Sequence, residues 1–506
     1  MTLASKLSTP DPERSKIGES GYRAWRAKLE ATGGCTHPVH LSGQWAIQHA
    51  TSGQTLARRA GQVMVACGNR RESVCPACSD RYAADAFHLL RAGLAGDEGK
   101  HIPANVADKP RLFLTLTAPS FGPVHNRRTS RNGKTLPCPC GGFHSEHDSQ
   151  IGQPLDPESY DYTGHVLWQA HAGELWNRFT NHVRRHLAKA AGIPIRAFPE
   201  HARISFAKVA EFQRRGLIHF HAVVRLDGPE SPGDPTPSWA DTEMLTDAIH
   251  AAHATAYVTG PEVADRRHVF NFGEQLDIRP IKPANASQLE DETGQISDDR
   301  LASYVAKYAT KGTATSEAAD KPIRSEAHID LLPANEHHRR IIRTAWHLGA
   351  PVPCPACHPD GEHAPEDCAC ATGGYCELCA GGGLVSRTTA RDYRHPELAD
   401  KPEPLDRLRL RKWAHMLAFR GPFLSKSKHD SVRFRDIRQA RADYRHRQAL
   451  ADLGIDDQSE ITVINDWAMT HIGHDSTDQR DLAEAIAYRN RELRQTRADH
   501  DRKEHP

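Results

Sequence analysis

Paired cysteines constrain the fold of this chain more than any other feature of its sequence. Cys354 and Cys357 are separated by two residues, as are Cys376 and Cys379, and 18 residues lie between the two pairs. Four cysteines at this spacing are typical of a zinc ribbon. In a reducing compartment such pairs bind zinc more often than they form disulfides, and buried free thiols are the alternative. The spacing predicts a zinc-ribbon insert over residues 351–390.

A second group of cysteines falls within residues 1–100, which we expect to form a zinc-knuckle region. A structural zinc ion supplies about 10–16 kcal/mol of folding free energy, enough to hold together a segment with few large apolar side chains. His37 or His40 could take the place of the first cysteine, and the spacing does not decide between them. The thiolates expected around one tetrahedral zinc are Cys35, Cys67, Cys75 and Cys78.

Weaker metal-binding signals lie elsewhere. A polar loop after the first strand contains Cys138, Cys140, His144 and His147, loosely of metal-binding type, and a solvated loop is an equal alternative. Within the ribbon insert, three further residues either ligate metal or simply lie in the loop: His363, Cys368 and Cys370.

Charge is distributed unevenly along the chain. The 506 residues carry a formal net charge of +1, but residues 401–447 contain 14 Lys or Arg against 5 Asp or Glu. A local basic stretch is the usual footprint of nucleic-acid binding. The N-terminus has no apolar signal core and no uncharged run is long enough to span a bilayer, so we expect a cytoplasmic protein without membrane contact. The length favours two to four domains.

Local patterns predict an α+β core. β-branched and aromatic residues predict a strand over 111–120 and a two-stranded hairpin over 203–228. Apolar periodicity predicts a long helix over 161–192, and capping residues delimit another over 298–312. We therefore expect a central antiparallel sheet flanked by helices.

Two histidines in the second strand of the hairpin, "GLIHFHAVV", share one face of the sheet. His219 and His221 point the same way and Phe220 points to the other face. If the turn is centred on Arg215, Glu211 lies opposite His219 and completes a ligand set for Mg²⁺ or Mn²⁺. A one-residue shift would turn this carboxylate away. The alternative is two ordinary histidines in a strand.

Two tyrosines share one face of the predicted helix over 298–312. Tyr304 and Tyr308 are four residues apart, as are Lys307 and Lys311, so the tyrosine Cβ atoms lie about 5–6 Å apart. A tyrosine hydroxyl can act as a covalent nucleophile, and a lysine one turn away lowers the phenol pKa or neutralises a phosphate. The alternative is an amphipathic helix that buries two aromatic side chains.

Three motifs, in this order, resemble those of the HUH endonucleases that initiate rolling-circle replication: "FLTLT", "HFH" and "YVAKYATK". Longer stretches, such as "CGNRRESVCPACSDRYAADAFHLL" and "AEFQRRGLIHFHAVVRLDG", resemble the replication initiators of actinomycete plasmids and integrative elements over most of residues 35–447. The resemblance implies an HUH endonuclease domain, ferredoxin- or RRM-like, over residues 101–350. That family usually carries a Cys-x-x-Cys where this chain has Asp156 and Ser159.

The resemblance also implies a partner and a chemistry. The partner is the DNA of a replication origin, single-stranded or in a hairpin, and a host helicase is a further partner that it suggests. A divalent ion at the histidine pair would polarise the scissile phosphate. Tyr308 would displace the 3′-hydroxyl and become joined to the 5′-phosphate, and Tyr304 would be a second nucleophile. The catalytic residues implied are Tyr308, Tyr304, Lys311 and Lys307.

Residues 391–506 are expected to form a basic, mostly helical DNA-binding tail. Basic side chains there alternate with Trp413, Phe419 and Phe423, which would stack on bases beside an electrostatic track. The alternative is a solvated basic surface. The residues expected to contact DNA are Arg411, Lys412, Arg420, Lys426, Lys428, Arg433 and Arg435.

Two other functions are compatible with parts of this pattern. A conjugative relaxase uses similar chemistry, but relaxases typically place the tyrosine before the histidine motif, whereas here it follows. In a non-catalytic zinc-containing DNA-binding regulator the cysteine sites and the basic tail would bind DNA while the histidines and tyrosines merely pack.

Overall fold

The computed structural model describes residues 19–130, 132–282, 296–297, 302, 321–358, 375–399, 401–428, 430–455 and 460–504. Several residues singled out in the sequence lie outside this described part of the chain: Tyr304, Lys307, Tyr308, Lys311, His363, Cys368 and Cys370.

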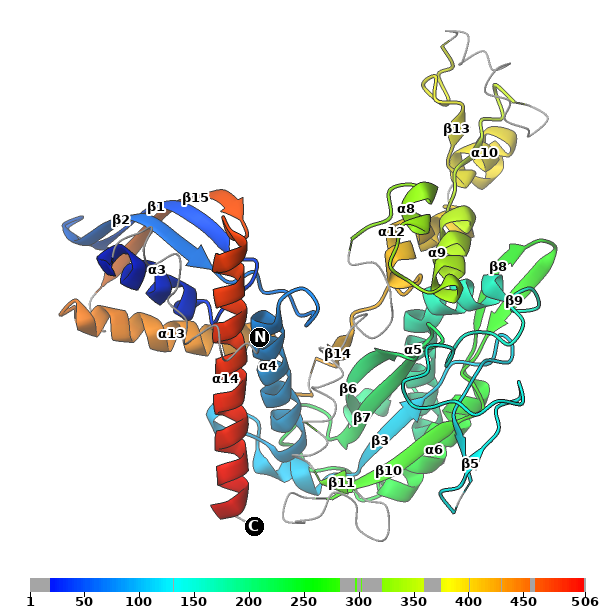
Figure 1. Ribbon diagram of the computed structural model, residues 1–506. Coiled ribbons are helices and arrows are strands. Elements are labelled where there is room, and N and C mark those ends of the chain that lie inside the picture. The colour runs from blue at the N-terminus through cyan, green and yellow to red at the C-terminus, as the bar shows by residue number, and fades with distance from the viewer. Residues whose placement is uncertain are drawn as a thin grey trace.

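The largest sheet has six strands in the order β11-β10-β3-β7-β6-β14 (Figure 1). Neighbouring strands are antiparallel except for β10 and β11, which are parallel. The central antiparallel sheet predicted from the sequence is therefore present. The strands are β3 (Arg111–Leu116), β6 (Arg203–Phe212), β7 (Ile218–Asp227), β10 (Leu276–Lys282), β11 (Ile296–Ser297) and β14 (Leu424–Lys426).

Helices cover both faces of this sheet. On one face, α5 (Tyr162–Ala190) and α6 (Thr242–Thr255) bury a large core in which Phe220 packs near Trp176. On the other face, leucines of α4 (Pro76–Ala95) share a smaller core with the sheet. Alternation along the strands explains the division, because successive side chains point to opposite faces.

The helix predicted over 161–192 is α5. Its first turn is capped by Asp161, whose carboxylate accepts a hydrogen bond of 2.7 Å from the backbone N–H of Gly164. The helix ends just before Gly192, which has a φ of 69°. A residue that adopts positive φ without strain is the usual helix terminator.

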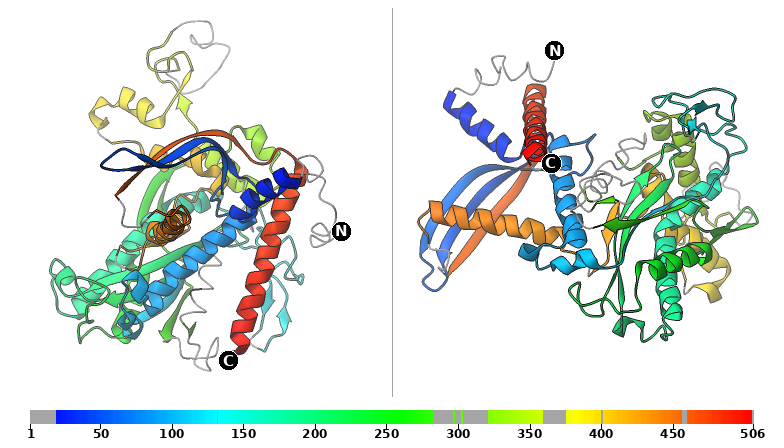
Figure 2. Two further views of the ribbon diagram at one scale, coloured as in Figure 1. Left: turned by 90° about the vertical axis from the view of Figure 1, so that its left-hand side faces the viewer. Right: turned by 90° about the horizontal axis from the view of Figure 1, so that it is seen from below.

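The two ends of the chain meet in a second sheet, with strand order β15-β1-β2. Its strands are β1 (Val39–His49), β2 (Thr55–Val65) and β15 (Ile461–Ile472). Figures 1 and 2 show this sheet, with α3 (Glu19–Ala31) and α14 (Thr477–Glu504), on the side of α4 away from the central sheet. The sequence patterns predicted a helical tail and missed β15, because its only described strand neighbour lies at the other end of the chain.

The remaining elements are short. The two strands β12 and β13 pair at the base of the ribbon insert. No helix among the described residues is long and apolar enough to cross a membrane. The strands are β4 (Arg128–Thr129), β5 (Thr135–Leu136), β8 (Val258–Val263), β9 (Arg266–Phe270), β12 (Val352–Pro353) and β13 (Leu384–Val385). The helices are α8 (Glu326–Asp330), α9 (Glu336–Leu348), α10 (Arg387–Arg394), α11 (Pro404–Leu408), α12 (Leu410–Trp413) and α13 (Phe434–Asp452).

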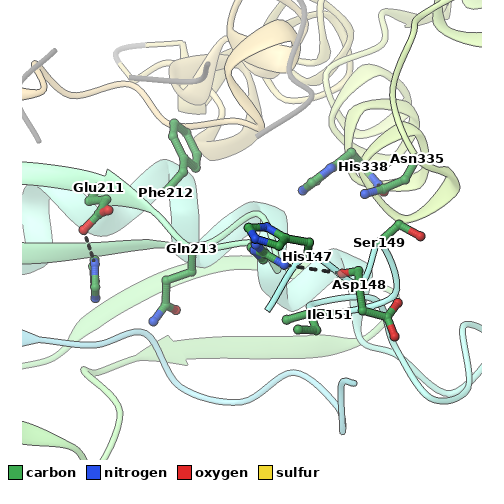
Figure 3. A pocket seen from close by; sticks show the side chains of 11 residues that line it. His147, Asp148, Ser149, Ile151, Glu211, Phe212, Gln213, Asn335 and His338 are labelled. Carbon is green, nitrogen blue, oxygen red and sulfur yellow. Dashed lines mark hydrogen bonds and ion pairs between the residues drawn. The ribbon is translucent and has the colours of Figure 1, made fainter. Parts of the chain in front are cut away.

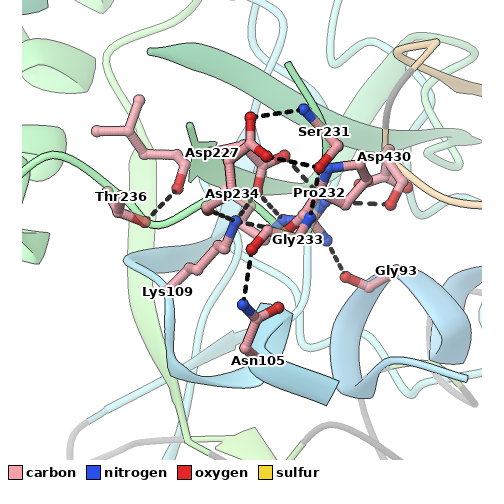
Figure 4. A network of polar contacts seen from close by, with 12 residues as sticks. Gly93, Asn105, Lys109, Asp227, Ser231, Pro232, Gly233, Asp234, Thr236 and Asp430 are labelled. Atoms are coloured by element: carbon pink, nitrogen blue, oxygen red, sulfur yellow. Dashed lines mark hydrogen bonds and ion pairs between the residues drawn. The ribbon is translucent and has the colours of Figure 1, made fainter. Parts of the chain in front are cut away.

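A buried ionic network ties α4 and the segment after β14 to the end of β7 (Figure 4). Arg225 donates to both carboxylate oxygens of Asp227, at 2.7 and 2.9 Å, and to the carbonyl oxygens of Gly93 and Asp430. Lys109 lies 3.4 Å from the same Asp227 carboxylate. Because paired charges are tolerated in a core only when they are also hydrogen-bonded, this network fixes how the three segments meet.

Lys208 is a buried cation on the α5 side of β6. Its ammonium group lies 3.9 Å from the ring centre of Phe220 and 5.2 Å from that of Trp176. Burial lowers the pKa of Lys208 to about 7 from its ordinary value of 10.5. The unfolded chain therefore binds more protons than the folded chain between these two pH values, so the free energy of unfolding rises with pH in that window.

We predict that Lys208→Met raises the free energy of unfolding by about 3–5 kcal/mol at pH 6, since burying the charged form is what costs stability. The gain should shrink as the pH is raised from 7 towards 10. Urea denaturation at several pH values measures both effects. Lys189→Met, on the exposed side of α5, is the matched control and should change stability by less than about 0.5 kcal/mol. A gain that does not depend on pH would contradict this account of Lys208.

Candidate functional site

The register of the β6–β7 hairpin sets the geometry of the candidate site. Glu211 pairs with His219, and the chain reverses between Phe212 and Ile218. This is the register that a carboxylate ligand requires. Nε2 of His219 lies 2.9 Å, and Nε2 of His221 3.1 Å, from Oε2 of Glu211. The three side chains thus meet on the sheet face that α4 partly covers.

These three atoms fit one hard divalent cation. Ligands that lie about 2.1 Å from Mg²⁺ in octahedral geometry are about 3 Å apart when they occupy neighbouring positions. The distances of 2.9 and 3.1 Å from Glu211 to the two imidazoles match this spacing. Glu211 can therefore share one octahedral cation with His219 and His221, which leaves the other positions for further ligands.

The charge states of Glu211 and His221 suit metal binding. Burial raises the pKa of Glu211, but the hydrogen bonds from His219 and His221 outweigh it and bring the pKa to about 2. Burial lowers the pKa of His221, although the contact with Glu211 opposes that shift. At neutral pH the carboxylate is ionised and the His221 imidazole is neutral, as metal ligands must be.

Neighbouring side chains of β3 hold the His221 ring. Thr115 pairs with His221 across the β3–β7 ladder, and its Oγ1 lies 3.2 Å from Nδ1 of the ring. Phe113 is nearly parallel to the ring, with centroids 5.8 Å apart. A hydrogen bond at the second nitrogen orients a ligating imidazole, so β3 directs Nε2 of His221 towards Glu211.

A groove of about 580 Å³ runs beside the triad. In Figure 3, Glu211 and Phe212 come from the strand on one side, whereas Asp148, Ser149 and Ile151 come from a loop on the other. The start of α9 contributes Asn335 and His338. The remaining lining residues are His147, Gln213, Arg214 and His219.

The N-terminal cysteines form a compact group. Sγ of Cys35 lies 3.7 Å from Sγ of Cys75 and 3.7 Å from Sγ of Cys78, and Sγ of Cys67 lies 3.6 Å from Sγ of Cys78. Four thiolates about 2.3 Å from a tetrahedral zinc are about 3.8 Å apart, so this group can hold a metal ion such as zinc. The sulfur of Cys35, rather than His37 or His40, is the fourth atom of this group.

The ribbon cysteines are arranged similarly. Sγ of Cys354 lies 3.9 Å from that of Cys376, and Sγ of Cys357 lies 3.6 Å from that of Cys379. Cys354 and Cys357 follow β12 and the other pair precedes β13, so a shared metal ion such as zinc would join the two ends of the insert.

Comparison with known proteins identifies the family. Residues 21–488 match the model of the RepSA family, described as "Replication initiator protein, pSAM2". The chain belongs to this family. A curated replication initiator protein of Streptomyces ambofaciens is 39% identical over 483 residues, which cover 93% of this chain and 91% of that protein. No solved structure matches significantly.

The family assignment confirms that the chain is a replication initiator, as its motifs indicated. The initiator therefore has, within its described residues, two four-cysteine groups able to hold zinc and one Glu-His-His group able to hold a harder ion. Soft thiolates and mixed oxygen and nitrogen donors favour different metals.

A fourth group of ligands lies in the loop between β3 and α5. His125, Cys138, Cys140 and His144 place one ligand atom each within 4.8 Å of one another. The sequence indicates His147 as the fourth residue of this group, and nothing in the spacing singles out His125. His147 instead lines the groove beside Glu211.

The basic residues of the initiator's C-terminal region have two kinds of surroundings. Arg411 stacks on Trp346, 4.3 Å from the ring centre, and Lys426 donates to the carbonyl oxygen of Ser431 at 2.7 Å, so both are partly buried. The others are exposed: Lys412, Arg420, Lys428, Arg433 and Arg435.

The aromatic residues in this region do not all have the expected role. Phe419 and Phe423 are 1% and 4% exposed and pack around Phe212, with ring centroids 6.2 and 5.7 Å from its ring. Their predicted stacking on DNA bases is therefore wrong, because the core that supports β6 already covers both rings. Trp413 is half-buried.

We predict that Cys78→Ser lowers the zinc content of the purified initiator by one ion per chain, since a serine hydroxyl is a poor substitute for a thiolate ligand. Elemental analysis measures the change. Ala77→Ser, which places a hydroxyl beside the same group, is the control and should keep the native zinc content. An unchanged content in Cys78→Ser would exclude zinc from this group.

Proposed function

We propose that this initiator nicks one strand of its replication origin by metal-dependent transesterification, with Tyr308 as the nucleophile. The observation that carries the proposal is the Glu211–His219–His221 group, which offers three ligand atoms for one divalent cation on an accessible groove. The motif resemblance assigns such a group to an HUH endonuclease domain, here within residues 101–350.

The position of Ala302 supports a nucleophile from the sequence segment that follows it. Ala302 is fully buried in the core that contains Phe113 and Val209, and these strand residues share the sheet face of the triad. Tyr304 and Tyr308 follow Ala302 by two and six residues in the sequence. An extended chain covers at most about 7 Å and 21 Å over these separations. The choice of Tyr308 over Tyr304 rests on the motif resemblance.

The chemistry exchanges one phosphodiester for another. Mg²⁺ or Mn²⁺ held by Glu211, His219 and His221 would polarise the scissile phosphate. The Tyr308 oxygen would form a bond to phosphorus while the bond from phosphorus to the 3′-oxygen breaks. The phenol would lose its proton and the leaving 3′-oxygen would gain one. Because one phosphodiester bond replaces another, the step would need no ATP and could run backwards to rejoin the strand.

The other assigned residues have supporting roles. Lys307 and Lys311 would contact the phosphate or lower the pKa of the phenol, and Tyr304 would cleave a second time while Tyr308 still holds DNA. The exposed basic residues of the C-terminal region would bind origin DNA through its backbone. Zinc at the two four-cysteine groups would be structural, and a host helicase would open the duplex.

We predict that the initiator, incubated with Mn²⁺ and labelled single-stranded oligonucleotides from around its own gene, forms a labelled adduct that survives SDS and disappears with protease. Tyr308→Phe and His221→Ala should each reduce the adduct at least 100-fold, because they remove the nucleophile and a metal ligand. Tyr257→Phe, an exposed tyrosine at the start of β8, is the matched control.

Three outcomes would change the assignment. Loss of the adduct only in Tyr304→Phe would exchange the roles of the two tyrosines. Cleavage without an adduct would indicate a metal-dependent hydrolase. Salt-sensitive DNA binding without any cleavage would favour the non-catalytic zinc-containing regulator.

A further inference from the structure

The loop between β3 and α5 brings two histidines and two cysteines to one point. Nε2 of His144 lies 3.2 Å from Nδ1 of His125 and 3.4 Å from Sγ of Cys140. In a tetrahedral zinc site, with bonds of about 2.3 Å to sulfur and 2.0–2.1 Å to nitrogen, two nitrogens are about 3.3 Å apart and a nitrogen and a sulfur about 3.6 Å apart. The observed distances match that geometry.

The cysteines lie in a tight turn suited to binding a metal. The backbone N–H of Cys138 donates to the carbonyl oxygen of Gly142 at 2.8 Å, and that of Gly141 donates to the carbonyl oxygen of Cys138 at 2.8 Å. The N–H of Gly142 points at Sγ of Cys140 from 3.4 Å. Such N–H groups stabilise a thiolate, the form of cysteine that ligates zinc.

A carboxylate orients one of the histidines. Oδ2 of Asp148 lies 2.7 Å from Nδ1 of His144, and Oδ1 of Asp148 accepts a hydrogen bond of 2.9 Å from the backbone N–H of Gln150. This leaves Nε2 of His144 facing Cys140 and His125. Ligating histidines in zinc sites typically use their second nitrogen in this way.

The loop that carries these four residues also builds the wall of the groove that faces the triad. Asp148 lines the groove, and its carbonyl oxygen accepts a hydrogen bond of 3.3 Å from Arg214 in the β6–β7 turn. His125 is tied to the far end of the wall, because it exchanges backbone hydrogen bonds of 2.8 Å with Gly152 and Gln153. Gly152, with a φ of 91°, packs so closely on the turn that a Cβ would lie 2.6 Å from the Arg214 backbone.

We propose that His125, Cys138, Cys140 and His144 form a further zinc site, and that the zinc holds residues 147–151 as the groove wall opposite Glu211 and His219. Four protein ligands leave no open position for water or substrate, so the ion is structural rather than catalytic. Asp148 is a positioning residue that acts through His144. That the wall contacts a DNA strand rests on the proposed function; the metal site does not.

Zinc content tests the site in the full-length initiator. Cys140→Ser should contain one zinc fewer per chain than the native protein. Cys140→His, which offers an imidazole nitrogen in place of the thiolate, should keep the native zinc content. Glu146→Gln, an exposed change in the same loop, should keep the native content. Equal zinc in Cys140→Ser and the native chain would overturn the proposal, whether or not the chain nicks DNA.

Hydrogen–deuterium exchange tests the second half of the proposal without any DNA. The Gly152 amide donates to His125, so peptides over residues 147–155 should exchange at least ten-fold faster in Cys140→Ser and return to the native rate in Cys140→His. A β7 peptide, such as residues 218–227, should exchange at the native rate in both variants. Loss of zinc with native exchange over 147–155 would show that the ion does not hold the wall. Failure of the proposed function is recognised separately, by the absence of a DNA adduct in the native chain.

Discussion

The pairing of Glu211 with His219 is the contact on which the rest of the site depends. A slip of one residue would move the carboxylate to the α5 side of the sheet and leave the two histidines without it. Several contacts oppose such a slip. Arg215 donates to the carbonyl oxygens of Ala118 and Pro119, and its own carbonyl oxygen lies 3.0 Å from Nε2 of His337 on α9. Hydrogen bonds therefore fix the turn on two sides, and the turn fixes the register of Glu211 against His219.

The segments far from the central sheet depend on other constraints. The N-terminal cysteine group joins the start of α4 to residues that precede β1 and follow β2, and Arg491 of α14 reaches Asp80 of α4 with a contact of 2.7 Å. Because β2 and β15 are exposed along most of their length, that part of the chain buries little apolar surface. A metal ion and a few ion pairs are an efficient substitute for a core there.

The sequence predicted the features that depend on residues close together in the chain, and missed those that depend on residues far apart. The hairpin, the proximity of Glu211 to the two histidines and the grouping of the ribbon cysteines could be predicted, because strand alternation, a turn glycine and a fixed cysteine spacing are local patterns. β15 could not, since Ala46 pairs with Ile464 from the other end of the chain. His125 was missed for a similar reason, as backbone pairing with Gln153 brings it to the cysteines. Phe419 and Phe423 were misassigned because alternation with basic residues does not show which way a ring points.

The two kinds of metal group impose different demands on the ions that they bind. Thiolates strongly prefer zinc, whereas a carboxylate with two imidazoles accepts zinc, manganese or magnesium, and intrinsic affinity rises from manganese to zinc. Glu211, His219 and His221 alone therefore do not exclude zinc. In the proposed function, a phosphate oxygen of DNA in the groove beside Glu211 and His219 would add a hard ligand. In the proposed reaction such a ligand would favour Mg²⁺ or Mn²⁺, while the cysteine groups, with four protein ligands each, would keep a softer ion such as zinc.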